Sequence, residues 1–86
     1  MTQEVLPSLS SLATSVIVGS IYEHYKGLRY KILGVGRHSE TLEELIIYQA
    51  LYGENDIWVR PLEMFFEATT VNGKSRLRFQ RVEQAL

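Results

Sequence analysis

Apolar residues along most of the chain fall into short runs that glycine and polar residues separate. β-Branched and aromatic side chains dominate these runs, and such residues favour strands over helices. In one run Leu28, Tyr30 and Ile32 alternate with Arg29 and Lys31, which leaves one face of this strand in water. The pattern therefore predicts a mainly β chain, with strands within residues 17–25, 28–37, 45–52 and 57–60.

The alternation in the second of these runs shifts after Ile32. Leu33 and Val35 are apolar out of phase, while Gly34 and Gly36 stand where the buried face would continue. An extra residue in one strand of an antiparallel pair causes such a shift, and glycine often marks the bend. We expect a bulge or sharp bend at Gly34, with the two halves of the strand joining different sheets of a small barrel.

The third run carries one polar residue, Gln49, between Leu45 and Tyr52. Both of its faces are therefore expected to be covered, one by the barrel interior and the other by a helix, the N-terminal segment or a second subunit. The fourth run ends at Pro61, which has no N–H to donate to a ladder. A single helical turn is expected after Pro61, over residues 62–65.

The strongest local signal is the Asn72-Gly73 pair, because these residues accept the positive φ angles of a two-residue type I′ turn. That turn fixes the cross-strand pairs of a hairpin, which are Val71 with Lys74, Ala68 with Leu77, Glu67 with Arg78 and Phe66 with Phe79. One face of the hairpin is then apolar and turned inward, and consists of Phe66, Ala68, Leu77 and Phe79. The other face is polar and consists of Glu67, Thr69, Arg76 and Arg78.

Together these elements predict a five-stranded, partly open antiparallel barrel, a single domain over residues 17–82. Residues 83–86 are expected to be a C-terminal tail. Within residues 1–16, Leu6, Leu9 and Leu12 are spaced by three, which fits one face of a short helix starting near Pro7. The alternative for this segment is a frayed tail.

Length and composition narrow the range of functions. A chain of 86 residues forms one small domain, which excludes a multi-domain enzyme. A net charge of −1 provides no overall field toward nucleic acid or anionic lipid. The absence of cysteine excludes disulfides and cysteine metal sites, and no basic N-terminal run or long apolar stretch suggests secretion or a membrane span. We expect a cytoplasmic protein without a membrane partner.

A metal-dependent hydrolase is one alternative function, with a site built from His24, His38 and Glu40. Their spacing matches no established zinc motif, because such motifs rely on fixed helical or turn offsets. The histidines can equally cap a turn or lie hydrogen-bonded in the barrel. Ser39 and Thr41 lack the Gly-x-Ser-x-Gly frame of a hydrolase nucleophile. We therefore expect no metal, no cofactor and no catalytic residue.

Basic residues concentrate toward the C-terminal end of the chain. Residues 66–82 contain four basic residues and one acidic residue, a net charge of +3, against −4 for the rest. Such a patch can bind phosphates, although a charged edge also keeps sheets from aggregating. Nucleic-acid binding is therefore a second, less favoured alternative, and its contacts would be Lys74, Arg76, Arg78 and Arg81.

Short blocks of residues also stand in a characteristic order between residues 19 and 79. They are HYKG at 24–27, Tyr30, HSET at 38–41, LYG at 51–53, WVRP at 58–61, MF at 64–65 and RF at 78–79. This ordered set resembles a family of small bacterial proteins known as a domain of unknown function, family 1653. The resemblance implies a Src-homology-3-like β-barrel, and it implies no cofactor or reaction.

The family pattern points to polar residues at strand ends and turns, where small barrels bind their partners. With the aromatic Trp58 added, the candidate ligand-binding residues are His24, Lys26, His38, Glu40, Thr41, Tyr48, Trp58 and Arg60. The alternative is one hydrogen-bonded network in which Glu40 holds Arg60. We predict a non-enzymatic binding module for a peptide, another protein or a nucleotide-like small molecule. We also expect self-association, because the third run and the N-terminal leucines expose apolar faces.

Overall fold

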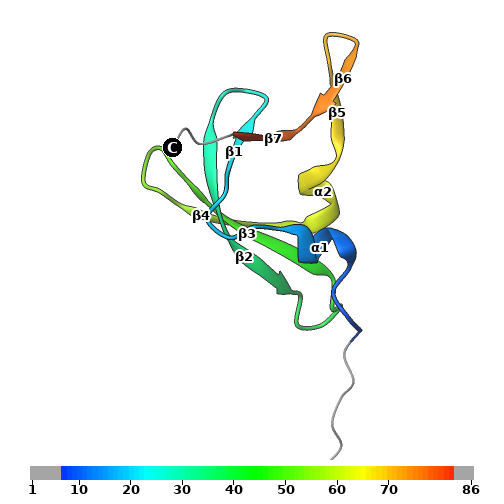
Figure 1. The fold of residues 1–86 in the computed structure, drawn as a ribbon. Coiled ribbons are helices and arrows are strands. Elements are labelled where there is room, and N and C mark those ends of the chain that lie inside the picture. Colours follow the sequence, from blue (N-terminus) through cyan, green and yellow to red (C-terminus); the bar gives the residue numbers. More distant parts are fainter. Residues whose placement is uncertain (1–6, 83–86) are drawn as a thin grey trace, which may run out of the picture.

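The computed structural model describes residues 7–82, in which the chain forms seven strands and two short helices (Figure 1). In chain order these elements are α1 (Ser11–Ser15), β1 (Ile21–His24), β2 (Arg29–Arg37), β3 (Glu44–Ala50), β4 (Ile57–Pro61), α2 (Leu62–Phe66), β5 (Ala68–Val71), β6 (Lys74–Leu77) and β7 (Phe79–Val82). No helix in this part of the chain is long and apolar enough to cross a membrane.

Five strands form one antiparallel sheet in the order β4-β3-β2-β1-β7, and β5 and β6 form a separate hairpin. The prediction of a mainly β, partly open fold is confirmed. The sheet does not close into a barrel, because β4 and β7 stand at opposite ends of the strand order. Figure 1 shows the predicted hairpin projecting from the body beyond α2, as a two-stranded sheet apart from the five-stranded one. The Src-homology-3-like assignment stays a prediction.

The core lies on one face of the five-stranded sheet, which we call the inner face. Its buried strand residues are Tyr30, Ile32, Ile46, Tyr48, Ala50 and Phe79. The two helices cover this face, since Ala13 of α1 and Leu62 and Phe65 of α2 belong to the same buried cluster. The helical turn predicted after Pro61 is therefore confirmed as α2, and it delivers two fully buried side chains to the core.

The bulge predicted in the second strand is present. The register between β2 and β3 shifts between Ile32 and Gly34, so that Leu33 has no cross-strand partner. The extra residue returns Val35 to the inner face and leaves Gly34 on the outer face. The expectation that the two halves of this strand join different sheets is wrong, because both halves of β2 pair with β3 in one sheet.

Strand β1 begins at Ile21, later than the first apolar run predicted, because the chain turns at Val18 and Gly19. The φ of Gly19 is 89°, in the left-handed region that favours glycine. The Gly19 N–H donates to the carbonyl of Ile32 over 2.8 Å. This turn therefore remains attached to the sheet although it is not part of a strand.

The hairpin of β5 and β6 has the predicted turn and register. Asn72 and Gly73 have φ values of 52° and 76°, as a type I′ turn requires. The cross-strand pairs run from Val71 with Lys74 to Ala68 with Leu77. At the base of the hairpin, Nη2 of Arg78 donates to the Glu67 carboxylate over 3.3 Å. The predicted opposite-charge pair is thus confirmed.

The predicted apolar face of this hairpin is wrong in part. Leu77 is 51% exposed and Ala68 is also exposed, because the hairpin projects away from the core. The strand breaks at Arg78, and Phe79 begins β7, which pairs with β1. Phe66, the predicted partner of Phe79, belongs to α2 instead.

The N-terminal segment includes helix α1, with Ser10 as its N-cap residue. Glu44, the first residue of β3, fixes this cap, since its carboxylate accepts bonds of 2.7 and 2.6 Å from the Ser10 N–H and Oγ. Leu12 packs against the core, whereas Leu9 is exposed and Leu6 lies outside the described residues. The predicted division of the chain into residues 1–16, 17–82 and 83–86 stays a prediction.

Candidate functional site

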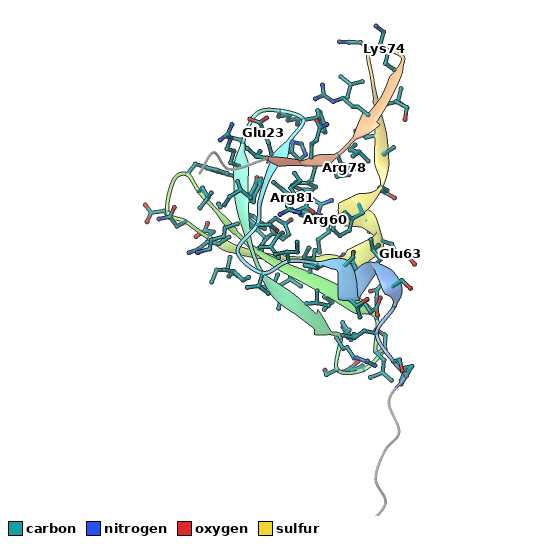
Figure 2. The ribbon with its side chains drawn as sticks, in the orientation of Figure 1. Glu23, Arg60, Glu63, Lys74, Arg78 and Arg81 are labelled. Atoms are coloured by element: carbon teal, nitrogen blue, oxygen red, sulfur yellow. The ribbon has the colours of Figure 1, made fainter. Side chains whose placement is uncertain are left out.

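An open pocket of about 250 Å³ lies on the inner face, beside the buried core. All five strands of the sheet contribute to its lining, together with the turns that follow β1 and β3. The lining residues are His24, Lys26, Leu28, Tyr30, Tyr48, Tyr52, Trp58, Arg60 and Phe79. Figure 2 shows Arg60 between the sheet and α2. The pocket brings together five of the predicted binding residues, which are His24, Lys26, Tyr48, Trp58 and Arg60.

Strand pairing explains why these side chains meet although they are far apart in the sequence. Tyr48 of β3 faces Trp58 of β4, and His24 of β1 faces Phe79 of β7. Directly opposed residues share a face of the sheet. Arg60 follows Trp58 by two residues, so its side chain emerges on the same face. The pocket is thus a consequence of the sheet register.

Phe79 forms the floor of the pocket and is 3% exposed. Its ring stacks on Phe65 of α2 with the ring centroids 4.1 Å apart. Tyr30, Tyr48 and His24 meet the same ring edge-on, with centroid distances of 5.7, 5.8 and 5.0 Å. Such edge-to-face contacts favour one arrangement of the rings. The floor of the pocket is therefore apolar and well packed.

Arg60 is held in the pocket by aromatic partners. Its guanidinium carbon lies 5.6 Å from the centroid of the Phe79 ring. Its Nε donates to the Tyr48 hydroxyl over 3.3 Å. The cation–π contact and the hydrogen bond both orient the guanidinium without neutralising its charge.

His24 lies beside this cation in a positive environment. Burial lowers the pKa of His24, and the charges of Lys26, Arg60 and Arg78 lower it further, so the imidazole is neutral at pH 7. The backbone N–H of Lys26 donates to Nδ1 of His24 over 3.2 Å, which leaves the proton of the neutral ring on Nε2. The pocket therefore has two permanent cations and a neutral N–H donor, and no carboxylate of the described residues lines it.

Tyr30 and Tyr52 share a hydrogen bond of 2.5 Å between their hydroxyls. Burial raises the pKa of Tyr30, and the bond to Tyr52 raises it further, so Tyr30 stays a neutral phenol. The predicted set of binding residues omits four lining residues, which are Leu28, Tyr30, Tyr52 and Phe79. Three of these belong to the ordered blocks of the family pattern, and that pattern was the available signal.

His38, Glu40 and Thr41 lie elsewhere, in the turn between β2 and β3. Nδ1 of His38 accepts hydrogen bonds from the N–H groups of Glu40 and Thr41 at 3.1 and 3.3 Å, so this side chain caps the turn. The turn stands at the far end of β2, about 26 Å along an extended strand from Tyr30 of the pocket. Arg60 bonds to Tyr48, and neither ion pair of the described residues joins it to Glu40, so the structure gives no support to the alternative in which Glu40 holds Arg60.

The three residues of the metal-site alternative do not meet either. His24 lines the pocket, whereas His38 and Glu40 belong to the distant turn. Over residues 7–82, no group of three or more His, Cys, Asp or Glu side chains is arranged to hold a metal ion. The geometry gives the hydrolase alternative no support.

The four basic residues of the nucleic-acid alternative are spread over the C-terminal strands. Lys74 and Arg76 are exposed on the hairpin, and Figure 2 shows Lys74 at its tip. Arg78 is bound to Glu67 at the base of the hairpin, and Arg81 lies on β7. These residues are distributed along the hairpin and β7, and none of them lines the pocket on the inner face.

The fold and the pocket define a small, mainly β domain in which an open antiparallel sheet carries an aromatic and basic pocket. Residues 20–81 match the family described as a protein of unknown function, DUF1653, and the chain belongs to this family. The family resemblance of the ordered sequence blocks is thus confirmed. A crystal structure of a DUF1653 protein from Bordetella bronchiseptica is similar, with a TM-score of 0.73 and 29% identity over 86% of this chain and 96% of that chain. No curated protein matches the chain.

Proposed function

We propose that this domain is a non-enzymatic binding module that holds a small anionic, nucleotide-like ligand in the pocket on the inner face. The observation that carries the proposal is the composition of the lining, which combines aromatic rings with two permanent cations and, among residues 7–82, contains no carboxylate. An anion is attracted to such a site, and a planar ring can stack within it.

Lys26 and Arg60 are the groups that would bind the anionic part of the ligand. Neither forms an ion pair with a carboxylate in the described part of the chain. The hydrogen bond from Arg60 to Tyr48 uses Nε alone, and a guanidinium binds phosphate or carboxylate oxygens through paired N–H groups. The Nε2–H of His24 provides a third donor for the same anion.

Trp58 and Tyr52 are the rings that would contact the planar part of the ligand. Their side chains are 50% and 38% exposed, unlike the buried Phe79 below them. Stacking of a base on an aromatic side chain contributes about 1–3 kcal/mol. The pocket volume of about 250 Å³ is slightly below the usual range for ligand pockets, which favours a ligand no larger than a mononucleotide.

The lining also supports binding without catalysis. In the part of the chain that the structure describes, it contains one histidine and three tyrosines, but no serine, cysteine, aspartate or glutamate that could act as a nucleophile or as the partner of a general base. The basic hairpin lies outside this pocket, so the proposal does not depend on it.

The single tryptophan of the chain is Trp58, so its fluorescence reports directly on the pocket. We expect saturable quenching by nucleoside 5′-monophosphates, and at least about tenfold weaker binding of the matching nucleosides and of inorganic phosphate. Arg60→Gln should weaken monophosphate binding by about tenfold or more, because a hydrogen bond to a charged group contributes about 1.5–3 kcal/mol. The matched control is Arg29→Gln, since Arg29 is exposed and pairs with Glu23 outside the pocket.

The proposal is wrong if no monophosphate binds saturably at millimolar concentration, or if Arg29→Gln weakens binding as much as Arg60→Gln. Binding of a single-stranded oligonucleotide tests the alternative function, nucleic-acid binding by the basic hairpin. Binding that Lys74→Gln abolishes and Arg60→Gln leaves unchanged would favour the nucleic-acid alternative instead.

A further inference from the structure

We propose that two copies of this chain associate through strand β4, an inference that does not depend on the proposed ligand. Strand β4 ends the sheet order, and its second edge pairs with no other described strand. Ile57, Trp58 and Val59 are 60%, 50% and 57% exposed and carry no charge. Proteins normally protect such an edge with charged residues, a bulge or a covering element. In β4 the charged Arg60 and Pro61 stand at one end only, and the three uncharged residues before them favour the addition of another strand.

The direction of the backbone groups follows from the pairing of β4 with β3. The Ala50 N–H donates to the carbonyl of Asp56 over 2.8 Å, and the register places Tyr48 opposite Trp58. Hydrogen-bonded and non-bonded pairs alternate along an antiparallel ladder. The even-numbered residues of β4 therefore bond to β3, and the N–H and C=O groups of Ile57 and Val59 point toward the open edge.

A two-fold axis at Trp58 uses all of these outward groups. Antiparallel pairing about this axis places Ile57 opposite the partner's Val59, where the two residues exchange both backbone hydrogen bonds. Symmetry repeats the same pair on the other side of the axis. A shifted axis is less favourable, because Pro61 has no N–H and Asn55 has a φ of 58°, which ends the extended segment.

The same register is complementary in charge, and this identifies the partner as a second copy. It places Asp56 opposite the partner's Arg60 at both ends, with the Cα atoms about 4.5 Å apart as in a non-bonded antiparallel pair. Within one chain the same two residues lie about 13 Å apart along the strand, so they do not pair with each other. Pairing with the partner's Asp56 requires the Arg60 guanidinium to turn away from its place 5.6 Å from the centroid of the Phe79 ring. Its Nη groups form no hydrogen bond within the described residues, since the bond to Tyr48 uses Nε.

The proposed pairing also extends an apolar surface. Ile57 and Val59 lie on the outer face of the sheet, where Val59 faces Ile47 of β3. Association brings Ile57 of one copy beside the partner's Val59 on this face. Edge-to-edge pairing widens this outer face without covering it, so the predicted cover of the third apolar run stays a prediction.

Cysteine cross-linking tests the register, because the chain contains no cysteine of its own. The two-fold axis places residue 58 opposite itself at a Cα separation that a disulfide spans. We expect Trp58→Cys to form disulfide-linked dimers in oxidised glutathione at least about tenfold faster than the control Leu77→Cys. Leu77 is a suitable control because it is 51% exposed and lies on the hairpin, away from β4. Circular dichroism verifies that both variants are folded.

Sedimentation equilibrium measures the association without a cross-link. We expect the unmodified chain to dimerise reversibly between micromolar and millimolar concentration, and Asp56→Lys to weaken the dimer at least about tenfold. The double variant Asp56→Lys, Arg60→Glu should restore it, since only a charge pair between copies predicts that rescue. A monomer at millimolar concentration, equal cross-linking of the two cysteine variants, or a double variant weaker than Asp56→Lys would each overturn the proposal. No ligand is present in these measurements, so their failure leaves the proposed pocket function unaffected.

Discussion

Phe65 is the side chain on which the packing of the domain depends most. It is fully buried, its ring stacks on Phe79 with an interplanar angle of 8°, and it meets Tyr22, Tyr48 and Phe66 edge-on at centroid distances of 5.3, 5.2 and 5.1 Å. Phe65→Ala removes all of these contacts and leaves a cavity between α2 and the sheet. We expect this substitution to destabilise the fold more than any change at an exposed position of the same helix.

The expected magnitude follows from burial and from the size of the domain. Substituting a buried phenylalanine by alanine reduces the free energy of unfolding by about 3–5 kcal/mol. The free energy of unfolding of a whole domain of this length is about 4–13 kcal/mol, so the substitution removes a large fraction of its stability. Each kcal/mol corresponds to about 4–8 °C in Tm for a small domain, which predicts a decrease of at least about 12 °C.

Urea unfolding followed by Trp58 fluorescence and by circular dichroism measures this loss. The matched control is Met64→Ala, since Met64 precedes Phe65 in α2 and is 44% exposed. We expect the control to change the free energy of unfolding by less than about 1 kcal/mol. If Phe65→Ala prevents folding altogether, Phe65→Leu replaces it, with a smaller loss that still exceeds that of Met64→Ala. Equal losses for Phe65 and Met64 variants would refute the assignment of Phe65 to the core.

Two further predictions concern the hairpin and the N-terminal cap. Gly73→Ala places a side chain at a φ of 76°, which costs about 1–2 kcal/mol. Hydrogen exchange should therefore show faster exchange of the β5 and β6 amides, and the turn assignment fails if the control Lys74→Ala has the same effect. Two hydrogen bonds from Ser10 lower the pKa of Glu44 below its ordinary value of 4.5. The stability that this carboxylate provides is therefore present above pH 4.5, and it is lost as the pH falls through the lowered pKa. Urea unfolding at decreasing pH measures how much the free energy of unfolding falls in acid. This fall should be smaller for Glu44→Gln than for the control Glu43→Gln, and equal falls would contradict the role of the cap.

Much of the fold was predictable because its signals are local. The alternation around Tyr30 and the phase shift at Gly34 reflect the two-residue period of a strand, and a bulge changes that phase in a definite way. The Asn72-Gly73 turn sets its own register through backbone conformation. The break at Arg78 was not predictable from the sequence, because the apolar residues on either side continue the same alternation. Whether Leu77 faces the core depends on the direction of the hairpin, which tertiary contacts decide.

The candidate site was predictable only in part for a related reason. The sequence blocks indicate which residues belong together in the family pattern, but they contain no information about distance. His38 and Glu40 stand in the same pattern as His24, yet the length of β2 separates them from the pocket. Phe79 was assigned to the hairpin, and pairing of β7 with β1 is what brings it beneath Arg60. A site assembled from five strands requires the strand order, which the sequence does not specify.

Trp58 and Arg60 belong both to the pocket and to the open edge of β4, so the two proposals share the same groups. Both residues lie on the inner face of β4, where they line the pocket. Because β4 is an edge strand, the same residues also lie next to any strand that pairs with it. An anion that binds the Nη groups of Arg60 competes for them with the partner's Asp56. Thermodynamic linkage then requires ligand binding to weaken the dimer by the same factor by which dimerisation weakens ligand binding. Together the two proposals therefore predict that occupancy of the pocket and self-association are coupled through one short strand.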